Sequence, residues 1–157
     1  MLNIVLVEPE IPQNTGNIAR TAAAIGARLH IVKPIPFEIS DKTVKRAGLD
    51  YWKYLDLEIH ENLAAFLEKY GDGSLFFIET GTDTPYTAVR YPPNPFLLFG
   101  SETKGLPQSL LSCGRGQALT IPILPHIRSL NLSNAVAVSA YEVLRQQNVH
   151  FSNPFNV

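Results

Sequence analysis

The sequence has little cysteine, no excess of either charge and no long hydrophobic run. Its one cysteine, Cys113, has no partner for an internal disulfide, which is typical of a reducing compartment. Thirteen Lys and Arg against fourteen Asp and Glu give a net charge of −1, which excludes a generally basic coat for nucleic acid. No apolar run approaches the roughly 20 residues that span a bilayer, and residues 1–5 lack the basic start of a signal peptide. We therefore expect a cytoplasmic protein.

Repeats, low-complexity tracts and linkers are also missing, so we expect a single domain over residues 1–157. Short apolar runs alternate with helical patterns. This alternation predicts an α/β fold, with a mostly parallel six-stranded sheet and helices on both faces. The predicted strands are 3–7, 29–32, 55–59, 74–79, 96–99 and 119–123. The predicted helices are 15–25, 40–47, 61–70 and 132–147.

Ligands bind at the carboxyl ends of the strands in such a sheet, which favours the loops after the first, fifth and sixth strands. In the first loop, Asn14 and Thr15 are expected to cap the helix that contains Arg20. A capped helix with a solvated arginine explains this pattern as well as a site does. Glu8 and Glu10 are expected to form salt bridges or face water. Because no metal-ligand cluster accompanies them, no metal site is expected.

The second loop, GSETKG at 100–105, imitates part of a phosphate-binding loop. Leu106 and Pro107 stand where the Walker A motif needs Lys and Ser or Thr, and no G-x-G-x-x-G follows the first strand. ATP hydrolysis and dinucleotide binding are therefore disfavoured. The glycines still allow close approach of a ligand to the backbone, and Glu102 adds a carboxylate. A plain turn before a helix remains the alternative.

The third loop, 122–134, places four neutral polar residues before an apolar helix: Ser129, Asn131, Ser133 and Asn134. One of them is enough to cap a helix, so the others are expected to bind something else. His126 is expected to be a surface residue. Cys113 has no adjacent His or Asp to activate it, which indicates an ordinary thiol.

Two further segments suggest partners. The last predicted helix is small or apolar all round over 135–141, so it is expected to be buried on more than one side, either inside the monomer or against another subunit. Basic and aromatic residues alternate over 42–54, a combination that suits looped RNA. A solvated helix followed by an aromatic core cluster explains this second segment equally well.

The three loops together resemble the SpoU branch of the SPOUT superfamily of RNA methyltransferases. The motif NTGNIAR at 14–20 matches the first signature of that branch, and FGSETKG at 99–105 matches the second. The third is matched by IP at 121–122 with RSLNLSNA at 128–135. EPEIP at 8–12 and RAGLDYW at 46–52 are similar to a subgroup of minimal enzymes that methylate the tRNA wobble ribose. The resemblance covers about residues 3–145.

The resemblance implies a trefoil knot at the C-terminal end of the sheet, formed by the second and third loops, which general rules on folds would have excluded. It implies that this knot holds the methyl donor S-adenosylmethionine in a bent shape. It also implies a homodimer that pairs through the knot and the first helix, and this raises the expectation that Tyr141 on the last helix faces a partner subunit. No appended RNA-binding domain and no metal are expected.

Site residues are carried over from the family by position. The catalytic residues implied are Arg20, Asn14, Glu102, Ser129 and Asn131. The residues implied for donor binding are Ile78, Thr80, Gly100, Glu102, Gly105, Ile121, Ser129 and Leu130. We expect the RNA to be bound by Arg20, Lys42, Lys45, Arg46, Lys104 and Arg128. In the family proposal Arg20 acts as a base with help from an RNA phosphate. Because the pKa of arginine exceeds about 12, we expect an electrostatic role instead.

The implied reaction is 2′-O-methylation of the wobble nucleotide, a cytidine or a modified uridine, in the tRNA anticodon loop. The same transfer on another tRNA position or on ribosomal RNA is the main alternative. A non-catalytic RNA-binding module of the same fold is the second. The SpoU motifs alone do not separate the first alternative from the wobble reaction, whereas Arg20, Glu102 and Asn131 argue against a non-catalytic module, which has no need of that set.

Overall fold

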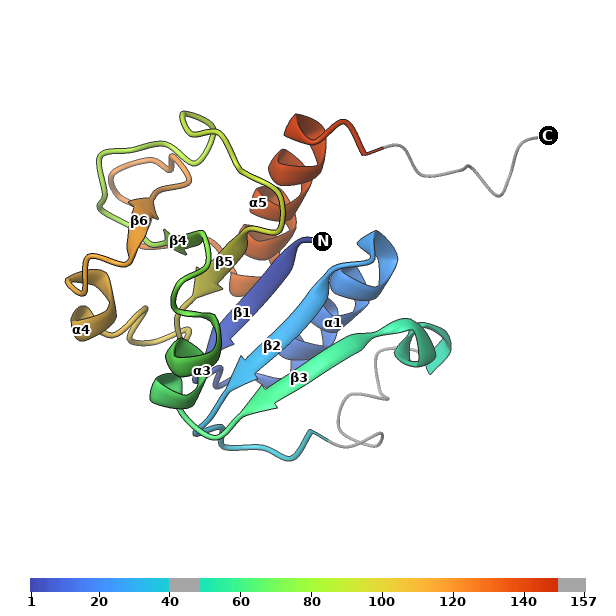
Figure 1. The fold of residues 1–157 in the computed structure, drawn as a ribbon. Helices are drawn as coiled ribbons and strands as arrows, with labels where there is room; N and C mark the ends of the chain where they lie inside the picture. The colour runs from blue at the N-terminus through green and yellow to red at the C-terminus, as the bar shows by residue number, and fades with distance from the viewer. Residues whose placement is uncertain (40–48, 150–157) are drawn as a thin grey trace.

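A computed structural model describes residues 1–39 and 49–149, and within them six parallel strands form one sheet in the order β3-β2-β1-β5-β4-β6 (Figure 1). The strands are β1 (Asn3–Val7), β2 (Arg28–Val32), β3 (Asp56–His60), β4 (Leu75–Ile78), β5 (Phe96–Phe99) and β6 (Gly116–Leu119). The helices are α1 (Pro12–Ile25), α3 (Leu63–Tyr70), α4 (Gln108–Leu111) and α5 (Leu132–Gln146), with a 3₁₀ helix, η2 (Leu49–Tyr54). The predicted parallel α/β class is confirmed.

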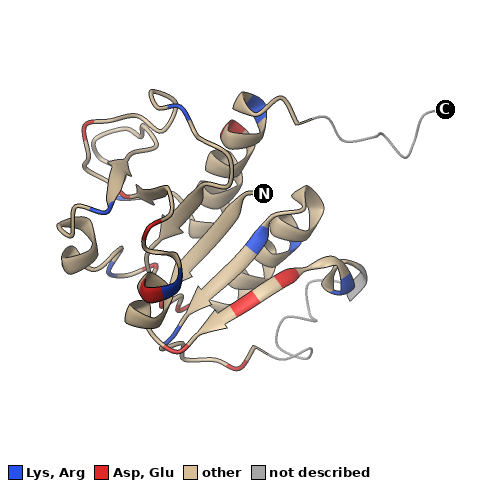
Figure 2. Cartoon of the chain, viewed as in Figure 1, with Lys and Arg blue, Asp and Glu red and all other residues tan. Residues whose placement is uncertain are grey.

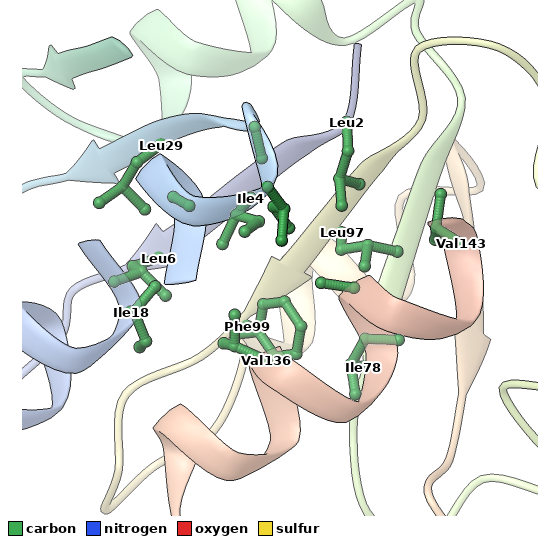
Figure 3. Packing of buried hydrophobic residues seen from close by; sticks show 14 of the residues in the cluster. Leu2, Ile4, Leu6, Ile18, Leu29, Ile78, Leu97, Phe99, Val136 and Val143 are labelled. Carbon is green, nitrogen blue, oxygen red and sulfur yellow. The ribbon is translucent and has the colours of Figure 1, made fainter. Parts of the chain in front are cut away.

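Helices cover both faces of the sheet because its central strands are apolar on both faces. Ile4 and Leu6 of β1 pack with α1 and α5, where Ile18 and Val136 are fully buried (Figure 3). Val5 and Val7 point to the opposite face and join the core under α3 and α4. The central strand β1 thereby contributes to two cores, one on each face of the sheet.

The first helix begins three residues earlier than predicted. Ile11 is its N-cap residue and makes no side-chain capping bond, and Pro12 occupies the first turn. Proline suits this position because it has no N–H to satisfy and its φ is already helical. The expectation that Asn14 and Thr15 cap the helix is therefore wrong: both are buried inside it. The predicted end is confirmed, since Gly26 adopts a left-handed φ of 65°.

The sixth strand was expected at 119–123 and instead spans Gly116–Leu119. It pairs in parallel with β4, Leu75 opposite Gly116 and Ile78 opposite Leu119. Pro122 has no N–H to donate to a neighbouring strand, so pairing stops before it. The β-branched residues that suggested a strand therefore lie in the loop that follows β6.

Some of the remaining predicted elements are confirmed, and others lie outside the described residues. The fifth strand and the last helix fall within a residue of the predicted bounds, and α3 is capped by Asn62, whose side chain accepts a hydrogen bond from Ala65 N. The basic helix predicted at 40–47 lies outside the described residues, as does most of the tail. In the part of the chain that the structure describes, no helix is long and apolar enough to cross a membrane.

Candidate methyl-donor and RNA site

A cavity of about 400 Å³ lies where the loops after β1, β4, β5 and β6 meet. All eight residues expected to bind the donor line this cavity: Ile78, Thr80, Gly100, Glu102, Gly105, Ile121, Ser129 and Leu130. Asn14, Lys104, Arg128 and Asn131 line it too. Four loops that are far apart in the sequence therefore contribute to one concave surface, at the strand ends where parallel sheets bind ligands.

Glu102 ties the first loop to the second. Its carboxylate accepts hydrogen bonds from Glu10 N at 2.8 Å, Ile11 N at 3.2 Å and Asn14 Nδ2 at 2.9 Å. Two of these donors are backbone groups at the start of α1, where the helix dipole also favours a negative charge. Glu102 thus holds the two residues that lead into α1, a helix that has no side-chain cap of its own.

Asn14 links the first loop to the third. Its side chain is buried, and its Oδ1 accepts a 2.9 Å hydrogen bond from Asn131 Nδ2. The Oδ1 atom of Asn131 accepts hydrogen bonds from Ser133 N and Asn134 N and so caps α5. Glu102, Asn14 and Asn131 form a chain of hydrogen bonds that joins all three loops. These bonds show that the three residues hold the cavity's walls in place.

A second link joins the same loops on the outer rim. The carboxylate of Glu10 accepts hydrogen bonds from Thr103 Oγ1, at 2.7 and 2.9 Å, and from Thr103 N. The carbonyl of Thr103 in turn accepts one from Arg128 Nη2 at 3.1 Å. Salt bridges or water contacts were expected for Glu10, and hydroxyl and amide contacts are found instead. No spacing in the sequence indicates this link, because Glu10 and Thr103 are 93 residues apart.

Glycines allow the second loop to fold back on itself. A Cβ at Gly100 would lie 1.9 Å from the carbonyl carbon of Gly105, which no other residue type tolerates. Gly105 has a φ of +69°, and a Cβ there would meet the carboxylate of Glu79. That carboxylate accepts hydrogen bonds from Thr80 N and Leu106 N. Backbone atoms therefore form much of the cavity wall, as expected where a ligand approaches closely.

Comparison with known proteins agrees with this geometry. The family model for the SpoU rRNA Methylase family matches residues 1–141. The chain belongs to the SpoU methylase family. It is 48% identical over 147 residues to the Escherichia coli (strain K12) tRNA (cytidine(34)-2'-O)-methyltransferase, covering 93% of this chain and 94% of the relative.

Two solved structures are similar in fold to this chain. One is described as "Structural insights into the 2-OH methylation of C/U34 on tRNA"; it is 46% identical, with a TM-score of 0.88, and covers 94% of this chain and 97% of the other. The second is an AdoMet-bound rRNA methyltransferase from Sinorhizobium meliloti, with 27% identity and a TM-score of 0.80. Our chain covers 56% of that longer protein, and the match spans 92% of our chain.

Among the expected site residues that the structure describes, Arg20 alone does not line the cavity. It is exposed on α1, with its guanidinium carbon 5.9 Å from the centre of the Tyr51 ring. The Tyr51 hydroxyl donates to Gly16 O at 3.2 Å, which fixes the ring beside α1. Burial raises the pKa of Tyr51 and outweighs the opposing effect of the nearby Arg20 charge. The ring is therefore neutral and presents its face to the arginine.

The other expected RNA-binding residues fall into two groups. Lys104 is exposed and lines the cavity. Arg128 lines it too, and its Nη2 donates to the carbonyl of Thr103, the residue before Lys104. Lys42, Lys45 and Arg46 lie outside the described residues, so their position relative to the cavity stays a prediction. The residues that sequence reasoning missed in this SpoU-family site are Glu10, Thr103 and Glu79.

Proposed function

We propose that this protein transfers the methyl group of S-adenosylmethionine to the ribose 2′-hydroxyl of the wobble nucleotide in a tRNA anticodon loop. The base is a cytidine or a modified uridine. The observation that carries this proposal is the single cavity lined by every residue expected to bind the donor. The E. coli relative supports the choice of substrate, because the match covers nearly all of both chains.

The cavity has the size and chemistry to hold the methyl donor. Its volume of about 400 Å³ lies within the range of roughly 300–1,000 Å³ typical of small-molecule pockets. Ile78, Ile121 and Leu130 supply apolar surface for the adenosine, and the backbone near Gly100 and Gly105 supplies hydrogen-bonding groups. This mixture suits a ligand with a flat base at one end and a charged amino acid at the other.

The donor, when bound, supplies a methyl group on a positively charged sulfur, and transfer breaks a C–S bond as a C–O bond forms. The hydroxyl proton is released to solvent in the net reaction. The protein must align the ribose oxygen with that carbon and stabilise the charge that develops as the proton leaves. Arg20 performs the second task, since a guanidinium remains protonated and donates in a planar fork. A phosphate of the RNA is held by the same fork.

Asn14, Glu102 and Asn131 act by holding the three loops in register, as their mutual hydrogen bonds require. Ser129 differs from them. It lines the cavity, and its hydroxyl makes no hydrogen bond to any other residue that the structure describes. We assign that hydroxyl to the donor or to the target ribose.

The RNA contacts are local, because the chain as a whole has a net charge of −1. Lys104 and Arg128 place positive charge at the mouth of the cavity. Lys42, Lys45 and Arg46 lie outside the described residues, and we assign them to further phosphate contacts. Each contact to a phosphate releases counterions, so binding weakens as salt rises.

The site is completed in a homodimer. Val138 and Tyr141 of α5 are 40% and 57% exposed, although Val136 and Ala140 on the same helix are fully buried. A second copy covers this apolar face and brings Arg20 of one protomer to the cavity of the other.

Residues 1–157 form a single domain, and the loops 100–105 and 122–134 form the trefoil knot that the family implies.

Transfer of tritium from labelled S-adenosylmethionine to tRNA that lacks its own modification tests the proposal, with the labelled nucleoside mapped afterwards. We expect label in a 2′-O-methylated wobble nucleotide. Label at another tRNA position or in ribosomal RNA contradicts the substrate. Tight donor binding with no transfer to any RNA contradicts the enzyme and favours a non-catalytic RNA-binding module.

A further inference from the structure

Two histidines and a glutamate meet on the face of the sheet that is covered by α3, away from the cavity. His30 of β2 is fully buried and His60 of β3 is 6% exposed. The parallel register places His30 opposite Glu58, with His60 two residues further along β3. His30 Nδ1 lies 3.0 Å from His60 Nε2, and His60 Nε2 lies 3.8 Å from Glu58 Oε1. All three atoms lie within 4.8 Å of one another.

The contact of the second ring nitrogen of His30, Nε2, determines the tautomer of this ring. His30 Nε2 lies 3.2 Å from Asn3 Oδ1, and an amide oxygen only accepts, so Nε2 carries the proton. Asn3 cannot turn its amide around without loss, because its Nδ2 donates to the carbonyls of Met1 and Pro95. The Nδ1 lone pair of His30 therefore points at His60. Metal-bound histidines are oriented by such a second hydrogen bond.

Both histidine side chains are buried among aromatic rings. Rings of Phe66, Tyr70 and Phe96 lie 5.0–5.9 Å from the His30 ring and keep water away from it. An apolar shell of this kind strengthens electrostatic contacts inside it.

The ammonium group of Lys69 already pairs with Glu58, the third residue of the cluster. The Lys69 ammonium donates to Glu58 Oε1 at 2.7 Å, and the Tyr70 hydroxyl donates to Glu58 Oε2 at 2.7 Å. Lys69 is 59% exposed and its side chain is long enough to move aside into water. Acidic residues on β3 and a basic one on β2 mark this edge of the sheet (Figure 2), where Arg28 also pairs with Asp56.

We propose that His30, His60 and Glu58 form a binding site for a divalent transition-metal ion, with Zn²⁺ the best fit. Two imidazoles and one carboxylate are a common zinc ligand set, and a water completes four-coordination. Bonds of about 2.0–2.1 Å at tetrahedral angles need the two nitrogens roughly 3.3 Å apart, a few tenths more than their present separation. His60 moves its proton from Nε2 to Nδ1 as the ion binds, and Lys69 leaves Glu58 with its charge intact.

The ion acts on the fold and takes no part in methyl transfer. β3 lies at one edge of the sheet, and among the strands that the structure describes it pairs only with β2. Ligands on both strands fasten that edge. No metal was expected from the loops, and this site escapes a motif search because His30 and His60 are 30 residues apart in sequence.

Only two histidines should remain in the protein used for the test. The chain has four histidines and one cysteine, so the changes Cys113→Ser, His126→Ala and His150→Ala leave His30 and His60 alone. This background protein, with any affinity tag removed, is titrated with Co²⁺ followed by its visible absorption, and with Zn²⁺ by calorimetry. We expect one ion per chain and a rise in Tm, because an ion that binds the folded state stabilises it.

Four single changes make the assignment specific. Glu58→Gln, in the background protein, should weaken Zn²⁺ binding at least tenfold, and His60→Gln should do the same. Glu68→Gln, an exposed carboxylate on α3, should leave affinity unchanged. Lys69→Gln should strengthen binding several-fold because it removes the competing charge. Absence of binding to the background protein overturns the proposal, as does an equal effect of Glu58→Gln and Glu68→Gln or weaker binding in Lys69→Gln. Unchanged S-adenosylmethionine affinity confirms that each variant is folded.

Discussion

The side-chain amide of Asn131 donates a 2.9 Å hydrogen bond to Asn14 Oδ1, across 117 residues of sequence. Asn14 in turn donates to Glu102, and Asn131 also caps α5. The start of α1, the loop 100–105 and the N-cap of α5 are thus joined by one chain of hydrogen bonds. Residues that look like independent polar groups in the sequence depend on each other in the fold.

Replacement of Asn14 by Ala should lower the free energy of unfolding by about 1–3 kcal/mol, since it leaves partners at Glu102 and Asn131 unsatisfied. It should also weaken donor binding, because both partners line the cavity. Urea unfolding and calorimetry with S-adenosylmethionine measure the two effects. Asn17→Ala, an exposed position on the same helix, is the matched control and should change neither. Equal effects of the two variants would contradict the role given to Asn14.

Thr103 should matter through its hydroxyl, which donates to Glu10. Thr103→Val keeps the shape and removes the donor, and it should raise the KM for S-adenosylmethionine about tenfold, the effect of losing one hydrogen bond to a charged group. Thr103→Ser keeps the donor and should stay near wild type. Steady-state kinetics at saturating RNA separates KM from kcat. A Val variant with a KM near wild type would contradict the role given to this hydrogen bond.

Arg20 should be needed for the chemical step more than for folding, because its side chain is exposed on α1. Loss of one charge-stabilising donor typically costs about 10²–10³-fold in rate, and we expect this of Arg20→Ala. Arg20→Lys keeps the charge without the planar fork and should be slowed at least tenfold. Single-turnover transfer with enzyme in excess gives the rates. Arg90→Lys, also exposed, serves as control; a near-normal rate in Arg20→Lys would exclude both the base and the electrostatic role.

Glu142 should make stability depend on pH in mildly acidic solution. Hydrogen bonds from Arg145, which outweigh burial, lower the pKa of this carboxyl below its ordinary value of 4.5. The unfolded chain then takes up the proton more readily, so the stabilisation is complete above about pH 4.5 and is lost as pH falls through the folded pKa. Glu142→Gln should destabilise the protein near pH 7, and its difference from wild type should shrink below pH 4.5. Denaturant unfolding at both pH values checks this; a constant difference would contradict it.

Sequence patterns were sufficient where one force decides the structure. The β-branched strand at Asn3–Val7 and the helix stop at Gly26 follow from local preferences, and the structure has both. Sequence patterns gave the wrong bounds for β6, because pairing with β4 overrides the weak strand preference of Gly116–Leu119. Residues from all three family motifs line one cavity, whereas Arg20 of the first motif does not. The motifs did not indicate the contacts of Glu10 with Thr103 or of His30 with His60, which arise only when distant segments meet.

The measurement that tests the central claim most directly compares two synthetic anticodon stem-loops that differ in one atom. One has ribose at every position, and the other has a 2′-deoxy sugar at the wobble nucleotide alone. With labelled S-adenosylmethionine, we expect methyl transfer to the first and none to the second, although both should bind the protein with similar affinity. Equal labelling of the two stem-loops would place the methyl group elsewhere and contradict the wobble ribose as the target.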